Sequence, residues 1–118
     1  MKLREIVSQI SIDPRKLIDY ALDPTNQSGG ADKAVLFQSC LGFTQKSYAS
    51  LLEQIETQAL DAEGVLGKLN QHGQRYQIDL VIIGSEERQE VVRTGWIVAP
   101  NSNVAKLTTL YVLRRRRR

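Results

Sequence analysis

The sequence predicts an α+β fold in which N-terminal helices pack on one face of a three- to four-stranded antiparallel sheet. In the first half of the chain, apolar residues recur with the helical period of about 3.6 residues. In the second half they alternate with polar residues, as in strands that are buried on one side. Helices followed by a run of strands are typical of α+β domains. The 118 residues, 42% of them hydrophobic and without a repeat or linker, suit a single domain over residues 1–113.

Two helices are expected in the first third of the chain. Residues 1–22 predict a short strand or coil and then a helix, because Asp13 can cap that helix and Pro14 suits its first position. A polar loop rich in turn-forming residues follows over 23–30. The second helix is expected over 32–42, with an aspartate as its N-cap and a glycine as the residue that ends it.

A third and longer helix is expected after Thr44, whose side chain can cap it. Its apolar residues follow the i, i+3, i+4, i+7 spacing of a helix with one buried face. These residues are Tyr48, Leu51, Leu52, Ile55 and Ala59. Gly64 and Gly67 are expected to end this helix, because glycine is a poor helix former.

The rest of the chain predicts strands joined by polar turns. The clearest strand covers 75–82, where tyrosine, isoleucine and leucine alternate with arginine, glutamine and aspartate. Two more strands are expected over 91–98 and 107–113, and a weaker one over 65–70. In the strand over 91–98, the alternation puts Arg93 on the face opposite the tryptophan.

The net charge of +3 comes from the end of the chain. Arg114–Arg118 supply five of the 16 basic residues, which leaves 11 against 13 acidic residues in the body. This balance excludes a uniformly positive nucleic-acid-binding surface. Because like charges repel, the tail over 114–118 is expected to be disordered. It is either an extension without function or a tether that holds RNA by counterion release.

Several classes of protein are excluded by what the sequence lacks. No apolar stretch approaches the ~18 residues of a membrane helix, and the N-terminus has no signal-peptide pattern. Cys40 has no second cysteine to pair with, and one cysteine with one histidine cannot build a zinc site. We therefore expect a cytoplasmic protein without a metal, a cofactor or a membrane contact.

The loop before the second helix is a candidate anion site. Gly29 and Gly30 allow a sharp turn that exposes backbone N–H groups, and Lys33 follows in the first helical turn. Together these groups would suit a phosphate. The alternative is an ordinary solvated loop, because the spacing matches no nucleotide-binding motif.

Further candidates lie on the sheet face that the helices leave open. Arg93 could make bidentate contacts to a phosphate, with the hydroxyl groups of Thr108 or Thr109 beside it. Alternatively, Arg93 marks a solvated surface, and the threonines and Tyr111 are simply good strand formers. His72, the one histidine, is either a general acid or base or a solvated turn residue.

Read in order, several segments resemble one known family. They are KLIDYALDP (16–24), GGADKAVLF (29–37), LGF (41–43), GQRYQID (73–79), VRTGWI (92–97) and LTTLY (107–111). In this order they resemble a bacterial and phage family of domains of unknown function. The chain is also similar, more distantly and at the level of the fold, to toxin domains of contact-dependent inhibition and other polymorphic toxin systems. Those domains resemble the barnase, EndoU, colicin and RelE-like group of metal-independent ribonucleases.

The resemblance implies a ribonuclease-like toxin domain that cleaves RNA, with tRNA as one candidate substrate. Carried over by position, the residues that match recurring polar and aromatic positions of the family are Lys33, Arg93, Thr94, Trp96, Thr108 and Thr109. Together with His72, the one histidine, this gives the expected catalytic residues Lys33, His72, Arg93 and Thr108. The cations would stabilise phosphorane charge, a threonine would bind phosphate, and the histidine or Tyr76 would transfer protons. The residues expected to contact the substrate are Gly29, Gly30, Tyr76, Thr94, Trp96, Thr109 and Tyr111.

The alternative function is a non-catalytic module that binds RNA or protein on the same face, including an antitoxin, an immunity protein or an accessory protein. Relatives often carry a histidine where this chain has Asn26, which favours that alternative if the histidine is a general base. A toxin would have a cognate antitoxin or immunity protein as its partner. The strand with Tyr76 and Ile78, or the final strand, could also pair two copies into a homodimer.

Overall fold

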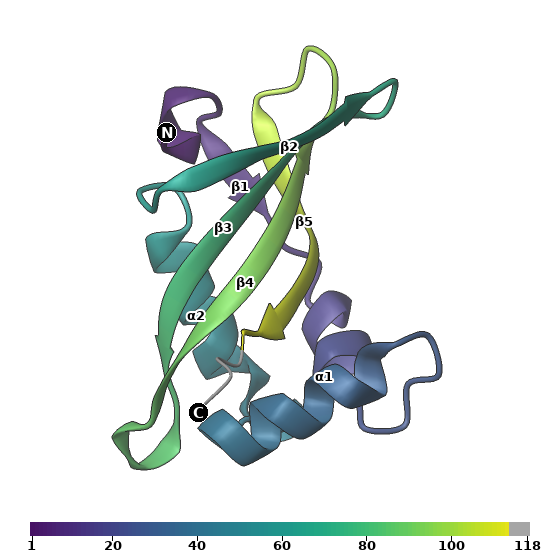
Figure 1. Cartoon of the computed structure of the whole chain (residues 1–118), viewed down its shortest axis with the longest axis vertical. Coiled ribbons are helices and arrows are strands. Elements are labelled where there is room, and N and C mark those ends of the chain that lie inside the picture. Colours follow the sequence, from purple (N-terminus) through teal and green to yellow (C-terminus); the bar gives the residue numbers. More distant parts are fainter. Residues whose placement is uncertain (114–118) are drawn as a thin grey trace, which may run out of the picture.

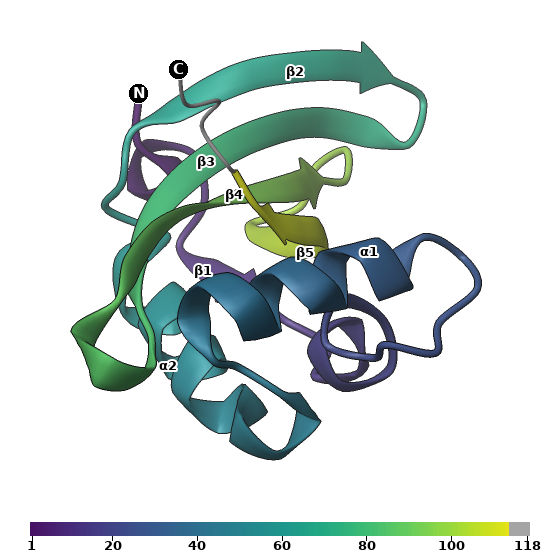
Figure 2. The same cartoon turned by 60° about the horizontal axis from the view of Figure 1, so that its bottom comes forward.

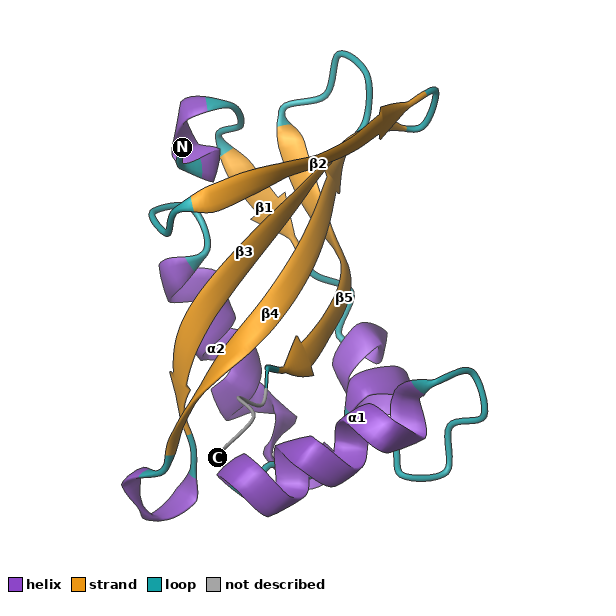
Figure 3. Ribbon diagram, in the orientation of Figure 1, coloured by secondary structure: helices purple, strands orange, loops and turns teal. Residues whose placement is uncertain are grey.

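Five strands form one mixed sheet in the computed structural model, which describes residues 1–113 (Figure 1; Figure 3). The strand order is β1-β5-β4-β3-β2, with β1 parallel to β5 and the other neighbouring pairs antiparallel. The strands are β1 (Gln9–Ser11), β2 (Gly64–Asn70), β3 (Gly73–Ile83), β4 (Gln89–Val98) and β5 (Val104–Val112). The α+β class is confirmed. The predicted tail over 114–118 lies outside the described residues.

Within residues 1–113, the helical elements are two α-helices and several short turns of 3-10 or π-helix. The α-helices are α1 (Gly30–Leu36) and α2 (Tyr48–Gln58). The short elements are η1 (Leu3–Glu5), η2 (Leu17–Ala21), η3 (Phe37–Leu41), η4 (Gln45–Ser47) and η5 (Ser85–Glu87). Among the described residues, no helix is long and apolar enough to cross a membrane.

The predicted sheet is wrong in its number of strands and in one pairing. The four strands expected from the sequence are present as β2 to β5, and β1 is the additional parallel strand. With three residues, β1 is too short to show an alternating pattern. Asn103 holds it beside β5, because its carbonyl and its Oδ1 accept the backbone N–H of Ser8 at 3.2 and 2.9 Å. This contact joins residues 95 positions apart, so no local pattern predicts it.

The helix expected over 32–42 begins earlier than predicted. α1 starts at Gly30, and η3 continues it to Leu41. Asn26, rather than the predicted aspartate, accepts a backbone N–H at the helix start, since its Oδ1 lies 3.1 Å from the nitrogen of Gly30. The predicted end is confirmed, because Gly42 closes the helix with φ +78°, a left-handed conformation that glycine adopts without strain.

The helix expected after Thr44 is confirmed at its start and wrong at its end. Thr44 Oγ1 accepts the backbone N–H of Lys46 at 3.3 Å, and η4 and α2 follow. α2 ends at Gln58, so neither Gly64 nor Gly67 ends it. Both glycines lie in β2 instead. The N–H of Gly64 donates to the carbonyl of the first residue at 2.6 Å, which ties this segment to the N-terminus.

One face of the sheet is buried under α2, which lies behind β3 and β4 in Figure 1. The buried side chains of β3 and β4 are Tyr76, Ile78, Leu80, Ile82, Val92, Thr94, Trp96 and Val98. The alternation predicted for these strands is therefore confirmed. α1 lies beside β5, as Figure 2 shows from below. The alternate residues of β3, β4 and β5 form the opposite face, called the open face below.

The strands expected to pair two copies of the chain are inside the sheet. β3 lies between β2 and β4, and β5 lies between β1 and β4. β1 pairs only with Val104, Ala105 and Lys106 of β5, and β2 reaches only to Ile78 of β3. The outer strands are β1 and β2. Pairing of two copies would therefore use an outer strand or the part of β5 that β1 does not reach, and the homodimer stays a prediction.

Candidate functional site

Three residues on neighbouring strands form a row across the open face. Asp79 of β3 lies opposite Arg93 of β4, and Arg93 lies opposite Tyr111 of β5. Arg93 donates two hydrogen bonds to Asp79, from Nε to Oδ1 at 2.9 Å and from Nη2 to Oδ2 at 3.1 Å. These bonds raise the pKa of Arg93 above its ordinary value. The pair therefore holds the guanidinium charged and in a fixed orientation beside Tyr111.

A hollow on the open face, called the sheet hollow, extends from β2 to β5. Its lining includes Lys68, Arg75, Gln77, Arg93, Thr108, Thr109 and Tyr111. Lys68 and Arg75 have no carboxylate within salt-bridge distance among residues 1–113. Their charges are therefore available to an anionic ligand.

A bulge in β5 carries Thr108 into the site. Gly95 pairs with Thr109 and Trp96 pairs with Leu107, so Thr108 is an extra residue in β5. Gly95 makes room for the two threonines, because a Cβ there would lie 3.1 Å from Thr108 Oγ1 and 3.2 Å from Thr109 Cγ2. The bulge lets Thr108 line the sheet hollow and also a second hollow beside η2.

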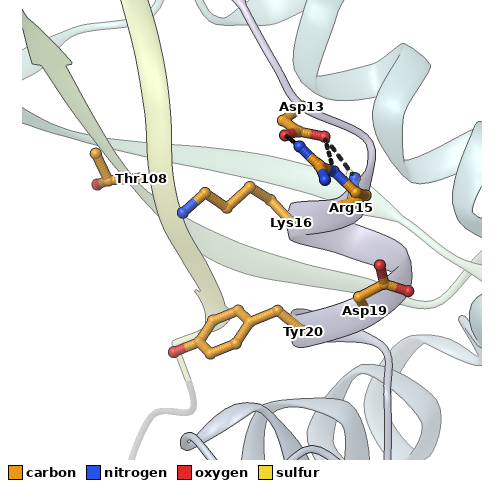
Figure 4. A pocket seen from close by; sticks show the side chains of 6 residues that line it. All are labelled: Asp13, Arg15, Lys16, Asp19, Tyr20 and Thr108. Atoms are coloured by element: carbon orange, nitrogen blue, oxygen red, sulfur yellow. Dashed lines mark hydrogen bonds and ion pairs between the residues drawn. The ribbon is translucent and has the colours of Figure 1, made fainter.

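This second hollow, the η2 hollow, lies between η2 and β5. Asp13, Arg15, Lys16, Asp19, Tyr20 and Thr108 line it. Figure 4 shows Tyr20 of η2 and Lys16, the residue just before η2, reaching toward β5, and Arg15 bonded to Asp13. Lys16 has no carboxylate within salt-bridge distance in the described part of the chain. Arg15 is engaged with Asp13 at 2.8 Å, so Lys16 supplies the available charge of this hollow.

A third hollow, the α1 hollow, lies between α1 and the end of β5. Asp32, Lys33, Leu36, Tyr111 and Val112 line it. Lys33 Nζ lies 5.2 Å from the ring centroid of Tyr20 and 5.7 Å from that of Tyr111, which are cation–π distances. Tyr111 lines both this hollow and the sheet hollow. The three hollows therefore adjoin along β5, joined by Thr108 and Tyr111.

The hollows concentrate positive charge on a body that is otherwise slightly acidic. Six of the 11 basic residues in residues 1–113 line them, against three of the 13 acidic residues. No group of three histidine, cysteine or carboxylate side chains that could hold a metal is found in the part of the chain that the structure describes. The arrangement suits an anion that is extended along β5, such as a chain of phosphates.

Most of the predicted catalytic residues meet in these hollows, and His72 does not. Lys33, Arg93 and Thr108 line them, as do the predicted substrate contacts Thr109 and Tyr111. His72 is an exposed residue in the turn between β2 and β3 and lines none of the three. In Figure 1 that turn is at the opposite end of the molecule from α1.

Three predicted substrate contacts are among the residues that line the sheet hollow, but they are buried in the core. Thr94 and Trp96 are 0% exposed, and Tyr76 is 7% exposed. The indole N–H of Trp96 donates to Thr94 Oγ1 at 2.7 Å, and Thr94 Oγ1 donates to the carbonyl of Ile78 at 2.6 Å. These hydrogen bonds satisfy the polar atoms internally, so the placement gives Thr94 and Trp96 a structural role.

The anion cradle expected at Gly29 and Gly30 is filled by a side chain of the same loop. Asn26 Oδ1 accepts the backbone N–H groups of Ser28 at 2.8 Å and Gly30 at 3.1 Å. Its Nδ2 donates to the carbonyl of Asp19 at 2.8 Å. The N–H of Gly30 is therefore not free for a phosphate. Gly30 is required by close packing, because a Cβ there would lie 2.2 Å from a backbone oxygen of η2.

Sequence reasoning missed Lys16, Tyr20 and Asp79 as site residues. Lys16 and Tyr20 are four residues apart, which places both on one side of a helical turn. That spacing indicates that the two side chains lie close together, but it does not indicate that they face β5. Strand alternation predicts Asp79 on the polar face of its strand, and only the strand register shows that it holds Arg93.

Comparison with known proteins finds similarity to a solved structure and to a protein family. Among curated proteins, none matches the chain. The structure is similar to a contact-dependent growth inhibition toxin–immunity protein complex from Klebsiella pneumoniae 342, with a TM-score of 0.70 and 16% identity over 88% of this chain and 93% of that chain. This likeness shows the fold alone and does not say whether the matched chain is the toxin or the immunity protein. Residues 2–114 match a domain of unknown function, DUF6883, as the sequence motifs indicated, and the chain therefore belongs to the DUF6883 family.

Proposed function

We propose that the chain is a ribonuclease-like toxin domain that binds RNA along the three hollows and cleaves it without a metal ion. The observation that carries the proposal is the gathering of cations and hydroxyl groups along β5. Lys16, Lys33 and Arg93 lie there with Thr108 and Tyr111, on a body whose net charge is negative. RNA presents repeated phosphates to such a surface, and its action would be in the cytoplasm.

The proposed chemistry uses the RNA as its own nucleophile. The 2′-oxygen attacks the adjacent phosphorus, and the products are a 2′,3′-cyclic phosphate and a new 5′-hydroxyl end. Negative charge grows on the phosphoryl oxygens as this happens, and fixed cations stabilise it. Arg93 is suited to this role because Asp79 fixes its orientation. Lys33 in the α1 hollow and the hydroxyl of Thr108 in the sheet hollow would make further contacts to the phosphates of the RNA.

The toxin assignment rests on the charge of the site together with the likeness to a toxin–immunity complex. A toxin of this kind would be held inactive by a cognate immunity protein or antitoxin. Such a partner would need acidic residues to cover Lys68, Arg75 and Lys16, which have no ion-pair partner among residues 1–113.

The test is cleavage of total tRNA by the purified chain in the presence of a chelator of divalent ions. We expect Lys33→Ala and Arg93→Ala to lower the cleavage rate by about 100-fold or more. Lys46→Ala is the matched control, because Lys46 is an exposed lysine on η4 that lines none of the three hollows. Induced expression should inhibit growth, and the two site variants should relieve the inhibition. A wild-type chain that neither cleaves RNA nor inhibits growth contradicts the proposal.

The alternative function is a non-catalytic module that binds RNA or protein through the same hollows. The position of His72 favours it, because the one histidine of the chain lies outside the three hollows. Asn26, which stands where relatives often carry a histidine, is occupied with backbone hydrogen bonds. If the module binds RNA, the wild-type chain would leave tRNA uncleaved in this assay but would bind it in a titration. Lys33→Ala and Arg93→Ala would abolish that binding.

A further inference from the structure

The proposed cleavage needs a group that gives a proton to the departing 5′-oxygen. Neither of the two groups predicted for proton transfer is well placed to supply it. His72 is in the turn between β2 and β3, and Tyr76 is buried on the inner face of the sheet. A different residue must therefore supply the proton if the chain is a ribonuclease.

We propose that Tyr111 is the general acid of this site, an inference that rests on the proposed ribonuclease function. Tyr111 is partly exposed and lines both the sheet hollow and the α1 hollow. Its neighbour across the strands is Arg93, and Lys33 Nζ lies 5.7 Å from its ring centroid. Tyr111 is therefore the tyrosine that neighbours both of the cations proposed to hold the reacting phosphate.

This position suits proton donation for an electrostatic reason. As the phenolic proton leaves, negative charge develops on the oxygen, and a nearby cation on either side stabilises it. The Asp79 carboxylate would oppose this, but it is bonded to Arg93 through both of its oxygens and lies on the far side of the guanidinium. Asp32 also lines the α1 hollow, on the side of Lys33.

Tyr20 is the other tyrosine near Lys33, and its position is less suitable. Its ring lies 5.2 Å from Lys33 Nζ, but it lines the η2 hollow rather than the sheet hollow that contains Arg93. Tyr20 therefore has one of the two cations beside it, and Tyr111 has both. We assign Tyr20 to holding Lys33 in place.

The proposed step balances in bonds and protons. The 2′-oxygen forms a bond to phosphorus as its proton passes to solvent water. The bond from phosphorus to the 5′-oxygen breaks, and the Tyr111 phenol gives its proton to that oxygen. The products are a 2′,3′-cyclic phosphate and a 5′-hydroxyl group, and the Tyr111 phenolate then recovers a proton from solvent.

The test compares two leaving groups at one cleavage site. The wild-type chain is first used to map a site in total tRNA, in the presence of a chelator. Two oligonucleotides that span this site are then made, one with the normal 5′-bridging oxygen and one with sulfur in its place. A thiolate leaves without being protonated, whereas an alkoxide requires an acid.

We expect Tyr111→Phe to lower the rate on the oxygen linkage by about 10²–10⁴-fold and to have little effect on the sulfur linkage. Tyr48→Phe is the control, because Tyr48 is on α2 and lines none of the three hollows. It should leave both rates unchanged. Thermal unfolding of each variant verifies that it folds.

Two results would overturn the assignment while the ribonuclease proposal stands. One is an equal loss on both linkages, which would mean that Tyr111 binds or positions the RNA. The other is no loss on either linkage. If the wild-type chain gives no cleavage site in tRNA, the ribonuclease proposal itself fails, and the assignment of Tyr111 fails with it.

Discussion

At the residue scale, the buried pair of Thr94 and Trp96 is expected to affect the stability of the fold and not the binding of RNA. Thr94 Oγ1 is the one hydrogen-bond acceptor that the structure gives to the indole N–H of Trp96, among residues 1–113. Replacing Thr94 with valine keeps the shape but leaves that N–H buried without a partner. Such a group costs about 1–3 kcal/mol of stability.

We therefore predict that Thr94→Val lowers the free energy of unfolding by about 1–3 kcal/mol while RNA binding by the folded protein is retained. Urea denaturation and an RNA-binding titration measure the two quantities. Thr109→Val is the stability control, since Thr109 is half-buried on the open face and should change stability by less than about 0.5 kcal/mol. Unchanged stability with loss of RNA binding would mean that Thr94 contacts the ligand after all.

A second residue-scale prediction concerns pH. Hydrogen bonds from the side chain and backbone of Arg15 lower the pKa of Asp13 to about 2, against about 3.9 in an unfolded chain. Because the folded value is the lower one, the carboxylate contributes stability that is present above about pH 4 and is lost as the pH falls toward 2. Asp13→Asn should therefore make stability less dependent on pH in this range.

Urea midpoints measured between about pH 5 and pH 2.5 test this prediction. The midpoint of the wild type should fall more steeply than that of Asp13→Asn. Asp32→Asn is the control, because Asp32 makes no ion pair among residues 1–113. Parallel curves for the wild type and Asp13→Asn would show that this ion pair contributes nothing in solution.

The site residues could be predicted from sequence only where residue type and strand alternation were sufficient. Arg93, Thr109 and Tyr111 follow from alternation, because a strand with one buried face must present its other residues outward. Lys16 and Tyr20 do not, because their role depends on β5, which lies about 90 positions further along the chain and beside η2 only in the fold. Lys33 and Thr108 were predicted both from residue type and from the family resemblance, and they line the hollows. His72 was predicted from residue type alone, and it lines none of them.

At the element scale, long segments with a regular apolar period were predictable. Short segments, and segments fixed by contacts from elsewhere in the chain, were not. β3 and α2 each bury one face over ten or more residues, so their periods are plain in the sequence. β1 has three residues and is held by Asn103 from the other end of the chain. The start of α1 depends on the Asn26 side chain, which no capping rule for Asp32 anticipates.

Two glutamines of α2 cover the part of the β3 edge that β2 does not reach. Gln54 Nε2 donates to the carbonyl of Ile83 at 2.8 Å, and Gln54 Oε1 accepts the N–H of Ile83 at 2.8 Å. Gln58 Nε2 donates to the carbonyl of Val81 at 3.1 Å. β2 pairs with β3 only up to Ile78, so these side chains take the place of a neighbouring strand.

We predict that Gln54→Ala speeds hydrogen exchange of the Ile83 amide and lowers the free energy of unfolding by about 1 kcal/mol. Gln58→Ala is the matched control, because Gln58 contacts a carbonyl and protects no amide on β3. Exchange followed by NMR distinguishes the two variants. If both variants leave the Ile83 amide equally protected, the edge is not held by Gln54.

At the scale of the whole molecule, the site is assembled from both halves of the chain. The N-terminal half supplies Lys16 just before η2, Tyr20 in η2 and Lys33 in α1. The C-terminal half supplies Arg93 from β4 and Tyr111 from β5. The hollows carry a local excess of basic residues, whereas residues 1–113 together have more acidic than basic residues. The affinity of this body for RNA should therefore come from a few placed cations rather than from net charge.

The contribution of the five arginines that end the sequence can be distinguished from that of the site by the salt dependence of RNA affinity. Removing residues 114–118 should leave the fold intact, because the buried core is formed within residues 1–113. If the arginines bind RNA, the slope of log affinity against log salt should become shallower by about 0.7 for each phosphate that the tail neutralises, or up to about 3.5 for five. Lys33→Ala in the shortened chain should then lower affinity further, because that lysine binds through the hollows. Titrations of a single-stranded oligonucleotide between about 50 and 200 mM salt measure both effects. An unchanged slope after truncation would mean that RNA binding is confined to the folded body.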